Sequence, residues 1–244
     1  MENKILFLDF DGVLFDTLRE VYLVNRLEYL KVPIFDAVDE ENYKLYYKYK
    51  YLVYNIWMFL YYNPLIFDGV EEKEIPALFK KALLKRDLKK EEEFCESFLN
   101  IRHDLIENHN SFWEKLEVPY DFFFKIKELY EKEKINIVVA SKKNKTSILK
   151  RFQNFGFNLP EDKVFAREAL EKYSSKAAFM EEYMLKNGFS SAVFVDDNIN
   201  NILPCKSLKR VKIETILALW GNTEPDSTGL NQKEAVEKIK EILF

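Results

Sequence analysis

Short apolar runs that end in polar, loop-forming residues recur along this chain. Runs of this length, bounded by polar residues, are typical of buried strands. The clearest examples are Lys4–Leu8, Ile135–Ala140 and Ala192–Val195, and weaker ones lie at Val164–Ala166 and Leu208–Ile213. We therefore predict strands over these five segments.

Helical patterns separate the strands in the second half of the chain. They cover Tyr120–Lys132, Lys145–Phe155, Ser175–Lys186, Asn200–Pro204 and Gln232–Leu243. Strands that alternate with helices are typical of a parallel sheet with crossover helices on both faces. The predicted fold is therefore α/β, with a Rossmann-like parallel sheet.

The region between the first strand and Val118 has a different character. It shows no convincing strand, and its apolar residues recur at helical spacing, as in Val21, Val24, Leu27 and Leu30. About a hundred residues are enough for an independent helical domain. We predict that residues 1–15 and 119–244 form the α/β core and that residues 16–118 form an inserted all-helical domain. The alternative is that these helices thicken a single core.

Within this region, Tyr51–Phe67 is strongly apolar and aromatic and follows several lysines, an arrangement that faintly suggests a membrane span. It contains Asn55, Asn63 and Pro64, and it is shorter than the ~20 apolar residues that a span requires. A buried helix or a substrate-facing wall is the favoured interpretation, and no membrane partner is expected.

The overall composition is ordinary for a globular protein and bears on its partners and its location in the cell. The 244 residues are 48% hydrophobic and 32% charged, with a net charge of −4, which gives no reason to expect a nucleic-acid partner. Cys95 and Cys205 lack metal-ligand spacing, as do His103 and His109. Two distant cysteines are interpreted as buried or idle thiols in a reducing cytosol. Together with an N-terminal apolar run too short for a signal peptide, they favour a cytoplasmic protein.

Two carboxylates stand where the first strand ends, in Asp9-Phe10-Asp11-Gly12. Catalytic and ligand groups of open α/β sheets gather at the carboxyl ends of strands. Carboxylates spaced by one residue can share a hard cation, or one can attack a phosphorus atom while the other handles a proton. Gly12 permits the sharp turn that follows. Taken alone, this motif is equally compatible with an ordinary turn.

A partial second copy, Phe67-Asp68-Gly69-Val70, has Ile66 where the first carboxylate would stand. Asn63-Pro64 interrupts its approach and argues against a regular strand. This copy is interpreted as a loop.

Further polar groups follow in a recognisable order. Ser141 ends the second clear strand, Lys176 opens a helix, and Asp196-Asp197 ends the third strand, 20 positions after the lysine. Together with Asp9 and Asp11, this order resembles the four motifs of the haloacid dehalogenase superfamily of phosphatases and related phosphotransferases. That superfamily inserts a helical cap between its first and second motifs, where the helical region of this chain lies.

The resemblance implies a role for each acidic residue. Asp9 would be the nucleophile that forms an aspartyl-phosphate, and it would also bind Mg²⁺. Asp11 would be the general acid–base, with its backbone carbonyl as a metal ligand. Asp197 and Asp196 would complete the Mg²⁺ site.

The phosphoryl group would be held by the Ser141 hydroxyl, by the backbone amides of Phe10 and Lys142, and by Lys176. Several alternatives stay open. Ser141 could cap the next helix near Asn144, Lys172 competes with Lys176, and Asp196-Asp197 could be a helix N-cap pair.

The roles of several other residues are also undecided by the sequence. Asn198, Asn200 and Asn201 stand where some relatives carry another acidic residue, and Asp16 fits either a hinge of the cap or a helix N-cap. The cap is expected to determine substrate specificity. The sequence does not decide which of its candidate residues contact the substrate: Tyr43, Lys44, Tyr46, Tyr47, Lys48, Lys50 or Tyr54.

The expected activity is Mg²⁺-dependent dephosphorylation of a small phosphorylated metabolite. A phosphomutase and a non-catalytic interaction protein on the same fold are the alternatives. Dehalogenation is disfavoured because that chemistry needs no proton-donating second aspartate. The sequence predicts neither the substrate nor the oligomeric state.

Overall fold

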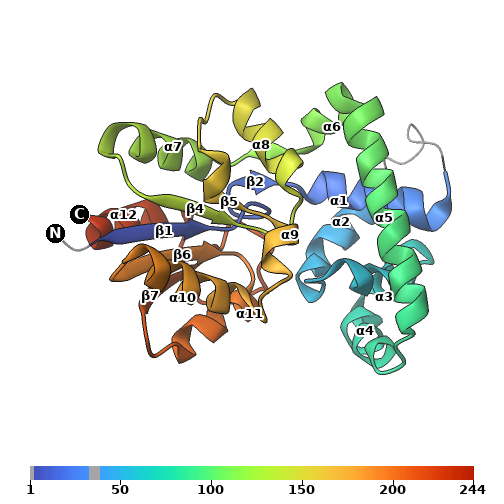
Figure 1. Ribbon diagram of the computed structural model, residues 1–244. Helices are drawn as coiled ribbons and strands as arrows, with labels where there is room; N and C mark the ends of the chain where they lie inside the picture. Colours follow the sequence, from blue (N-terminus) through green and yellow to red (C-terminus); the bar gives the residue numbers. More distant parts are fainter. Residues whose placement is uncertain (1–2, 33–38) are drawn as a thin grey trace. The chain divides into compact units, whose positions relative to one another are not determined.

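The computed structural model describes residues 3–32 and 39–244, which divide into two compact units (Figure 1). The α/β unit comprises Met1–Asp16 and Val118–Phe244, and the helical unit comprises Thr17–Glu117.

A five-stranded parallel sheet organises the α/β unit, in the order β5-β4-β1-β6-β7. Its strands are β1 (Lys4–Leu8), β4 (Ile137–Ala140), β5 (Val164–Phe165), β6 (Ser191–Asp196) and β7 (Lys212–Leu217). β1 is central, with Leu8 opposite Val139 of β4 and opposite Val195 of β6. Four of its five residues are buried, as a strand covered on both faces requires.

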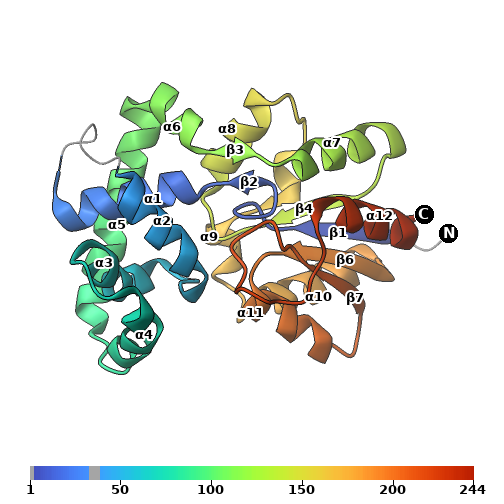
Figure 2. The ribbon, with the colours of Figure 1, turned by 180° about the vertical axis from the view of Figure 1, so that it is seen from behind.

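Helices cover both faces of this sheet (Figures 1 and 2). Leu6 and Leu8 of β1 pack in one apolar cluster with residues of α7 (Asp121–Glu133), α8 (Lys145–Asn154) and α12 (Gln232–Leu243). Ile5 and Phe7 point the other way, into a cluster with α10 (Lys176–Asn187) and α11 (Ile199–Ile202). The predicted α/β fold is confirmed. Shorter elements are α9 (Arg167–Leu170) and the 3₁₀ turns Glu161–Lys163 and Leu203–Ser207.

Several predicted boundaries were wrong. β7 begins four residues later than predicted, because Leu208 only ends the preceding 3₁₀ turn. Its first four residues alternate between exposed and half-buried, as in an edge strand with one covered face, before the strand becomes fully buried. β4 also begins two residues later than predicted, at Ile137.

The sequence analysis also missed a two-residue pair of strands. β2 (Phe15–Asp16) pairs antiparallel with β3 (Val118–Pro119), with Asp16 opposite Val118. The suggested N-cap role of Asp16 is wrong, since Asp16 belongs to β2 and Thr17 is the residue that precedes the next helix.

Described by itself, the helical unit has its own apolar core, which includes Tyr22, Tyr46, Tyr62, Phe98 and Trp113. No strand occurs among its described residues. Its helices are α1 (Leu18–Leu30), α2 (Glu40–Tyr49), α3 (Phe59–Phe67), α4 (Ile75–Leu83), α5 (Leu88–Asn108) and α6 (Asn110–Leu116), with 3₁₀ turns at Lys50–Leu52, Ile56–Met58 and Glu72–Glu74.

The apolar stretch Tyr51–Phe67 contributes to this core through Met58, Phe59, Tyr62 and Ile66, all buried. Across the described residues, no helix is both long and apolar enough to cross a bilayer. Asp68 and Gly69 follow α3, and Gly69 has a φ of +73°, so the loop predicted for the second motif copy is confirmed.

Candidate active site

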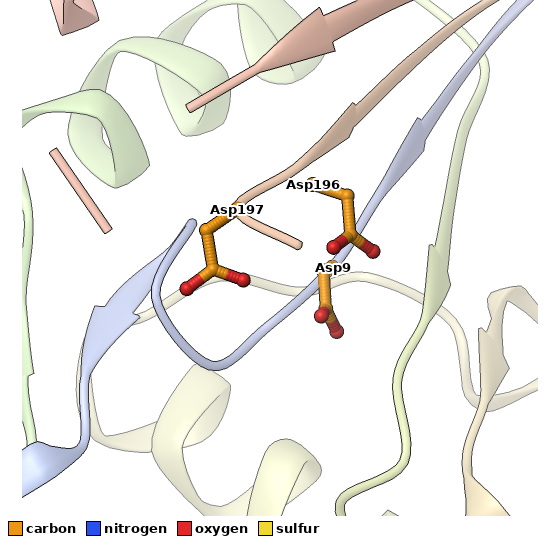
Figure 3. A group of neighbouring side chains, drawn as sticks. All are labelled: Asp9, Asp196 and Asp197. Carbon is orange, nitrogen blue, oxygen red and sulfur yellow. The ribbon is translucent and has the colours of Figure 1, made fainter. Parts of the chain in front are cut away.

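Three carboxylates converge at the carboxyl edge of the sheet (Figure 3). Asp9 follows β1, Asp196 ends β6 and Asp197 comes next in the chain. Because β1 and β6 are parallel neighbours, their carboxyl ends meet. One oxygen from each carboxylate lies within 4.8 Å of the others, and all three residues are buried. The sequence prediction named all three.

Asp9 is held at both of its carboxylate oxygens. Oδ1 accepts a hydrogen bond of 2.7 Å from the Phe10 amide, and Oδ2 lies 2.8 Å from Lys176 Nζ. Burial raises the pKa of Asp9 to about 6, and the charge of Lys176 limits that rise. The Lys176 charge thus favours the ionised form of this buried carboxylate.

Lys176 bridges two carboxylates, since its Nζ also lies 2.8 Å from Asp196 Oδ2. Burial alone would lower the pKa of this lysine, but the charges of Asp196 and Asp9 outweigh burial and raise it. The ammonium group therefore stays charged. Lys172, the competing candidate, is exposed, whereas Lys176 is buried at the site.

Asp196 is completely buried, and both of its oxygens are engaged. Oδ1 accepts from the Asn198 amide at 2.8 Å, and the Asn201 side chain donates to both oxygens at 3.0 Å. Asn201 thus orients the carboxylate that holds Lys176. The alternative that Asp196-Asp197 caps α11 is wrong, because Asn198 is the N-cap.

Asp197 is enclosed by two loops that bring glycines against it. Its Oδ2 accepts a hydrogen bond of 2.8 Å from the Asn222 amide. Gly12 has a φ of +76°, and a Cβ there would lie 1.9 Å from Asp197 Oδ2. At Gly221 a Cβ would lie 2.3 Å from the Gly12 carbonyl oxygen and 2.4 Å from Asp197 Cβ. Only residues without a side chain fit on either side of this aspartate.

Asp11 lies outside the carboxylate cluster and has a different partner. Its Oδ1 is 3.2 Å from Nζ of Lys143, a lysine whose side chain is 1% exposed. The Lys143 ammonium also lies 5.6 Å from the centre of the Phe10 ring, an additional favourable contact for a buried cation. The sequence analysis missed Lys143; the available signal was the lysine pair that follows Ser141.

Ser141 is buried directly after β4, the other neighbour of β1. Its amide donates to the Phe165 carbonyl at 3.0 Å, and its Oγ accepts a long hydrogen bond of 3.4 Å from the Lys143 amide. The helix-cap alternative for Ser141 is wrong, because α8 is capped by the Asn144 side chain, which accepts from the Ser147 amide. Lys142 is exposed.

The structure also shows which of the candidate specificity residues in the helical unit are buried and which are exposed. Tyr46 is fully buried and its hydroxyl meets Asn25, so Tyr46 is a core residue rather than a substrate contact. Lys48 pairs with Glu72. Tyr47 and Tyr54 are half-exposed.

The donor set suits a hard divalent cation. Three carboxylates and one ammonium group leave an excess of negative charge, and oxygen ligands are those that Mg²⁺ prefers. Asp9, Asp196 and Asp197 can each offer one oxygen to such a cation.

No protein-family model matches the sequence, and no curated protein sequence matches it closely. Solved structures do match. A predicted phosphatase from Clostridium acetobutylicum is 15% identical, with a TM-score of 0.62 and coverage of 99% of this chain and 100% of that one.

Two further structures have similar folds. A HAD-superfamily hydrolase of subfamily IA, variant 1, from Geobacter sulfurreducens PCA is 13% identical, with a TM-score of 0.56 and coverage of 97% and 96%. A structure titled putative phosphoglycolate phosphatase, from Lactobacillus delbrueckii subsp. bulgaricus ATCC BAA-365, is 11% identical, with a TM-score of 0.62 and coverage of 98% and 99%. At these identities the likeness shows the fold, and the expected resemblance is confirmed at that level.

Proposed function

We propose, from the haloacid dehalogenase-like fold that the chain shares with these structures, that it is a Mg²⁺-dependent phosphatase acting on a small phosphorylated metabolite. The observation that carries the proposal is the environment of Asp9. This carboxylate is buried and ionised at the end of the central strand, held by Lys176 and next to Asp197.

In the first step a carboxylate oxygen of Asp9 attacks the phosphorus atom of the substrate. The bond from phosphorus to the leaving oxygen breaks, and protonated Asp11 gives that oxygen its proton. The products are an aspartyl-phosphate on Asp9 and the free alcohol. Lys176 offsets the negative charge that Asp9 and the phosphoryl group bring together.

In the second step ionised Asp11 accepts a proton from water while the water oxygen attacks the phosphorus atom. The acyl-phosphate bond breaks, inorganic phosphate leaves, and Asp9 is regenerated as a carboxylate. One residue thus serves as acid and then as base. The Lys143 ammonium group donates a hydrogen bond to Asp11 Oδ1 at 3.2 Å, which orients this carboxyl group in both steps and leaves the other oxygen to carry the proton.

Mg²⁺, when bound, would reduce the repulsion between the Asp9 carboxylate and the phosphoryl dianion. Asp9, Asp197 and the Asp11 carbonyl are the groups that would hold it. Ser141 would donate its hydroxyl to the phosphoryl group, aided by the amides of Phe10 and Lys142.

The comparisons support the substrate class only broadly. Small phosphate esters are the proposed substrates because the similar structures include a predicted phosphatase and a putative phosphoglycolate phosphatase. The inserted helical unit is proposed as the part that selects among such esters.

The decisive experiment replaces the nucleophile. Asp9→Asn is nearly isosteric but a poor nucleophile, so turnover of an aryl phosphate with Mg²⁺ should fall at least about a thousandfold while circular dichroism stays unchanged. Asp162→Asn is the matched control, because the Asp162 side chain is 73% exposed and far along the chain in a 3₁₀ turn. Substantial turnover by pure, folded Asp9→Asn protein would refute the covalent mechanism.

A further inference from the structure

A turn in the helical unit carries a cluster of unusually exposed apolar side chains. It joins α4 to α5, and Leu84 and Leu88 at its two ends are 83% and 69% exposed. Among the described residues these are the two most exposed large hydrophobic side chains. Scattered exposed leucines are ordinary, but two such leucines at one turn point to a contact surface.

Lysines surround the same turn. Lys80 and Lys81 belong to the last turn of α4, Lys85 lies between the helices, and Lys89 and Lys90 belong to the first turn of α5. All five are exposed. The chain as a whole carries a net charge of −4, so this concentration of positive charge is local. We call Lys80–Lys90 the basic tip.

Hydrogen bonds and a cation–π contact fix the conformation of the basic tip. Arg86 forms two hydrogen bonds with Glu91, of 2.9 and 2.6 Å, and its guanidinium lies 3.8 Å from the centre of the Trp57 ring. The Asp87 amide donates to the Tyr61 hydroxyl at 2.8 Å, and the Asp87 side chain caps α5. The leucines are therefore presented on a fixed turn.

Lys89 and Lys90 lie in the first turn of α5, where a positive charge destabilises the helix. The amino-terminal turn of a helix carries partial positive charge, which repels cations. Their nearest carboxylates, Glu93 and Asp87, lie at 3.7 Å and leave both lysines largely exposed. These long ion pairs leave both ammonium groups accessible to an external anionic surface.

We propose that the basic tip docks on an anionic lipid surface, with Leu84 and Leu88 inserted among the acyl chains and the five lysines at the lipid phosphates. Adjacent apolar and polybasic groups are the combination that binds peripheral proteins to such membranes reversibly. A nucleic acid would use the lysines but not the leucines. Glu92 and Glu93 follow one turn further along α5 and reduce the attraction, which makes the docking weak and dependent on salt.

This contact involves a different part of the chain from the apolar stretch that first suggested a membrane. Tyr51–Phe67 is folded into the core of the helical unit through Phe59 and Tyr62. The basic tip differs in being exposed, short and positively charged. The proposal is independent of the phosphatase activity.

Co-sedimentation of the full chain with vesicles tests the proposal. At low salt the protein should bind vesicles that contain phosphatidylglycerol in phosphatidylcholine, and should bind pure phosphatidylcholine vesicles far less. The double variant Leu84→Ser/Leu88→Ser should lower the partition constant about tenfold or more. The triple variant Lys80→Gln/Lys81→Gln/Lys85→Gln should lower it about a hundredfold, at about fivefold for each lysine.

The matched control is Leu185→Ser/Lys186→Gln on α10, where Leu185 is 42% exposed, and it should leave binding unchanged. Circular dichroism checks that every variant is folded. Failure of the wild-type chain to bind anionic vesicles would overturn the proposal. So would binding that requires the lysines but not the leucines, since that result indicates a purely ionic partner.

Discussion

Each aspartate at the edge of this sheet has different partners, and the partners determine what it can do. Asp9 is held by one amide and one lysine, Asp196 by a lysine and two asparagines, and Asp197 by an amide between two glycines. Asp11 pairs with Lys143. Four residues of one chemical type thus have four different environments.

The pairing of Asp11 leads to a prediction for Lys143. In Lys143→Met the Asp11 carboxylate loses the ion pair that orients it, so turnover of alkyl phosphates should fall by about tenfold to a hundredfold. Aryl phosphates, whose leaving groups need less protonation, should lose less in the phosphorylation step. Rapid-quench measurement of the phosphoenzyme with both substrate types provides the test.

Lys145→Met, two residues along the chain at the start of α8, is the control for removing a lysine from this loop. An equal loss for alkyl and aryl substrates would show that Lys143 supports the fold rather than proton transfer.

The raised pKa of Asp9 predicts a pH dependence of stability in the Mg²⁺-free protein. Burial moves the pKa from 3.8 to about 6 on folding, so the folded state binds more protons than the unfolded state between these values. The contribution of Asp9 to stability is therefore most favourable below pH 4 and falls as the pH rises through 6. Asp9→Asn removes this dependence.

The gain in unfolding free energy from Asp9→Asn should consequently be larger at pH 8 than at pH 5, by about 1 kcal/mol. Urea unfolding at the two pH values measures it, with Asp162→Asn as the exposed comparison. A gain that shrinks as the pH rises would contradict the assignment of burial as the dominant cause.

At the scale of elements, the site depends on how closely the loops after β1 and β7 approach each other. Gly221→Ala would place a Cβ 2.3 Å from the Gly12 carbonyl oxygen, so one loop must move and carry Asp197 with it. We expect a loss of about 1–3 kcal/mol in stability and at least a tenfold weaker Mg²⁺ activation of turnover.

Gly188→Ala is the comparison without a steric clash, because a Cβ there meets nothing within 4 Å; unlike Gly221, Gly188 has a positive φ, of +69°. That variant should lose about 1 kcal/mol of stability with no change in Mg²⁺ activation. A similar effect of both substitutions on Mg²⁺ activation would show that the crowding around Asp197 is unimportant.

The strands also differ in how well the sequence predicts them. β1 and β6 were predictable because they are uniformly apolar runs that end in carboxylates. β7 was predicted with wrong bounds, because its first residues, among them Lys212 and Glu214, are polar on the exposed face. β2 and β3 were missed because two residues are too short to give a pattern.

The residues that hold the site aspartates in place could not be predicted, for a different reason. Asn222 and Lys143 act through contacts that depend on how the loops fold, and asparagine or lysine in a loop carries no distinctive spacing. Asn201 was named, but only as one of three asparagines after Asp197, and its bonds to Asp196 come from the folded loop. The principal carboxylates, by contrast, stand at strand ends, where topology alone brings them together.

At the scale of the whole molecule, cation binding should stabilise the folded chain. A ligand that binds only the folded state adds about 2.7 kcal/mol at a hundredfold excess over its Kd. Mg²⁺ should therefore raise the thermal unfolding temperature of the wild-type protein, and Asp197→Asn should abolish most of that rise. Scanning calorimetry with NaCl at matched ionic strength separates binding from salt effects. An equal Mg²⁺ effect in Asp197→Asn would place the cation elsewhere.

The central position of β1 has a consequence for how the chain folds as it is synthesised. β1 leaves the ribosome first, yet the strands on either side of it, β4 and β6, come roughly 130 and 190 residues later. At about 5–20 residues per second, β1 waits several seconds or more for a neighbour. The helical unit, whose core is continuous in sequence, is complete by Glu117. It can therefore fold while the apolar segment Ile5–Leu8 still lacks both of its neighbouring strands.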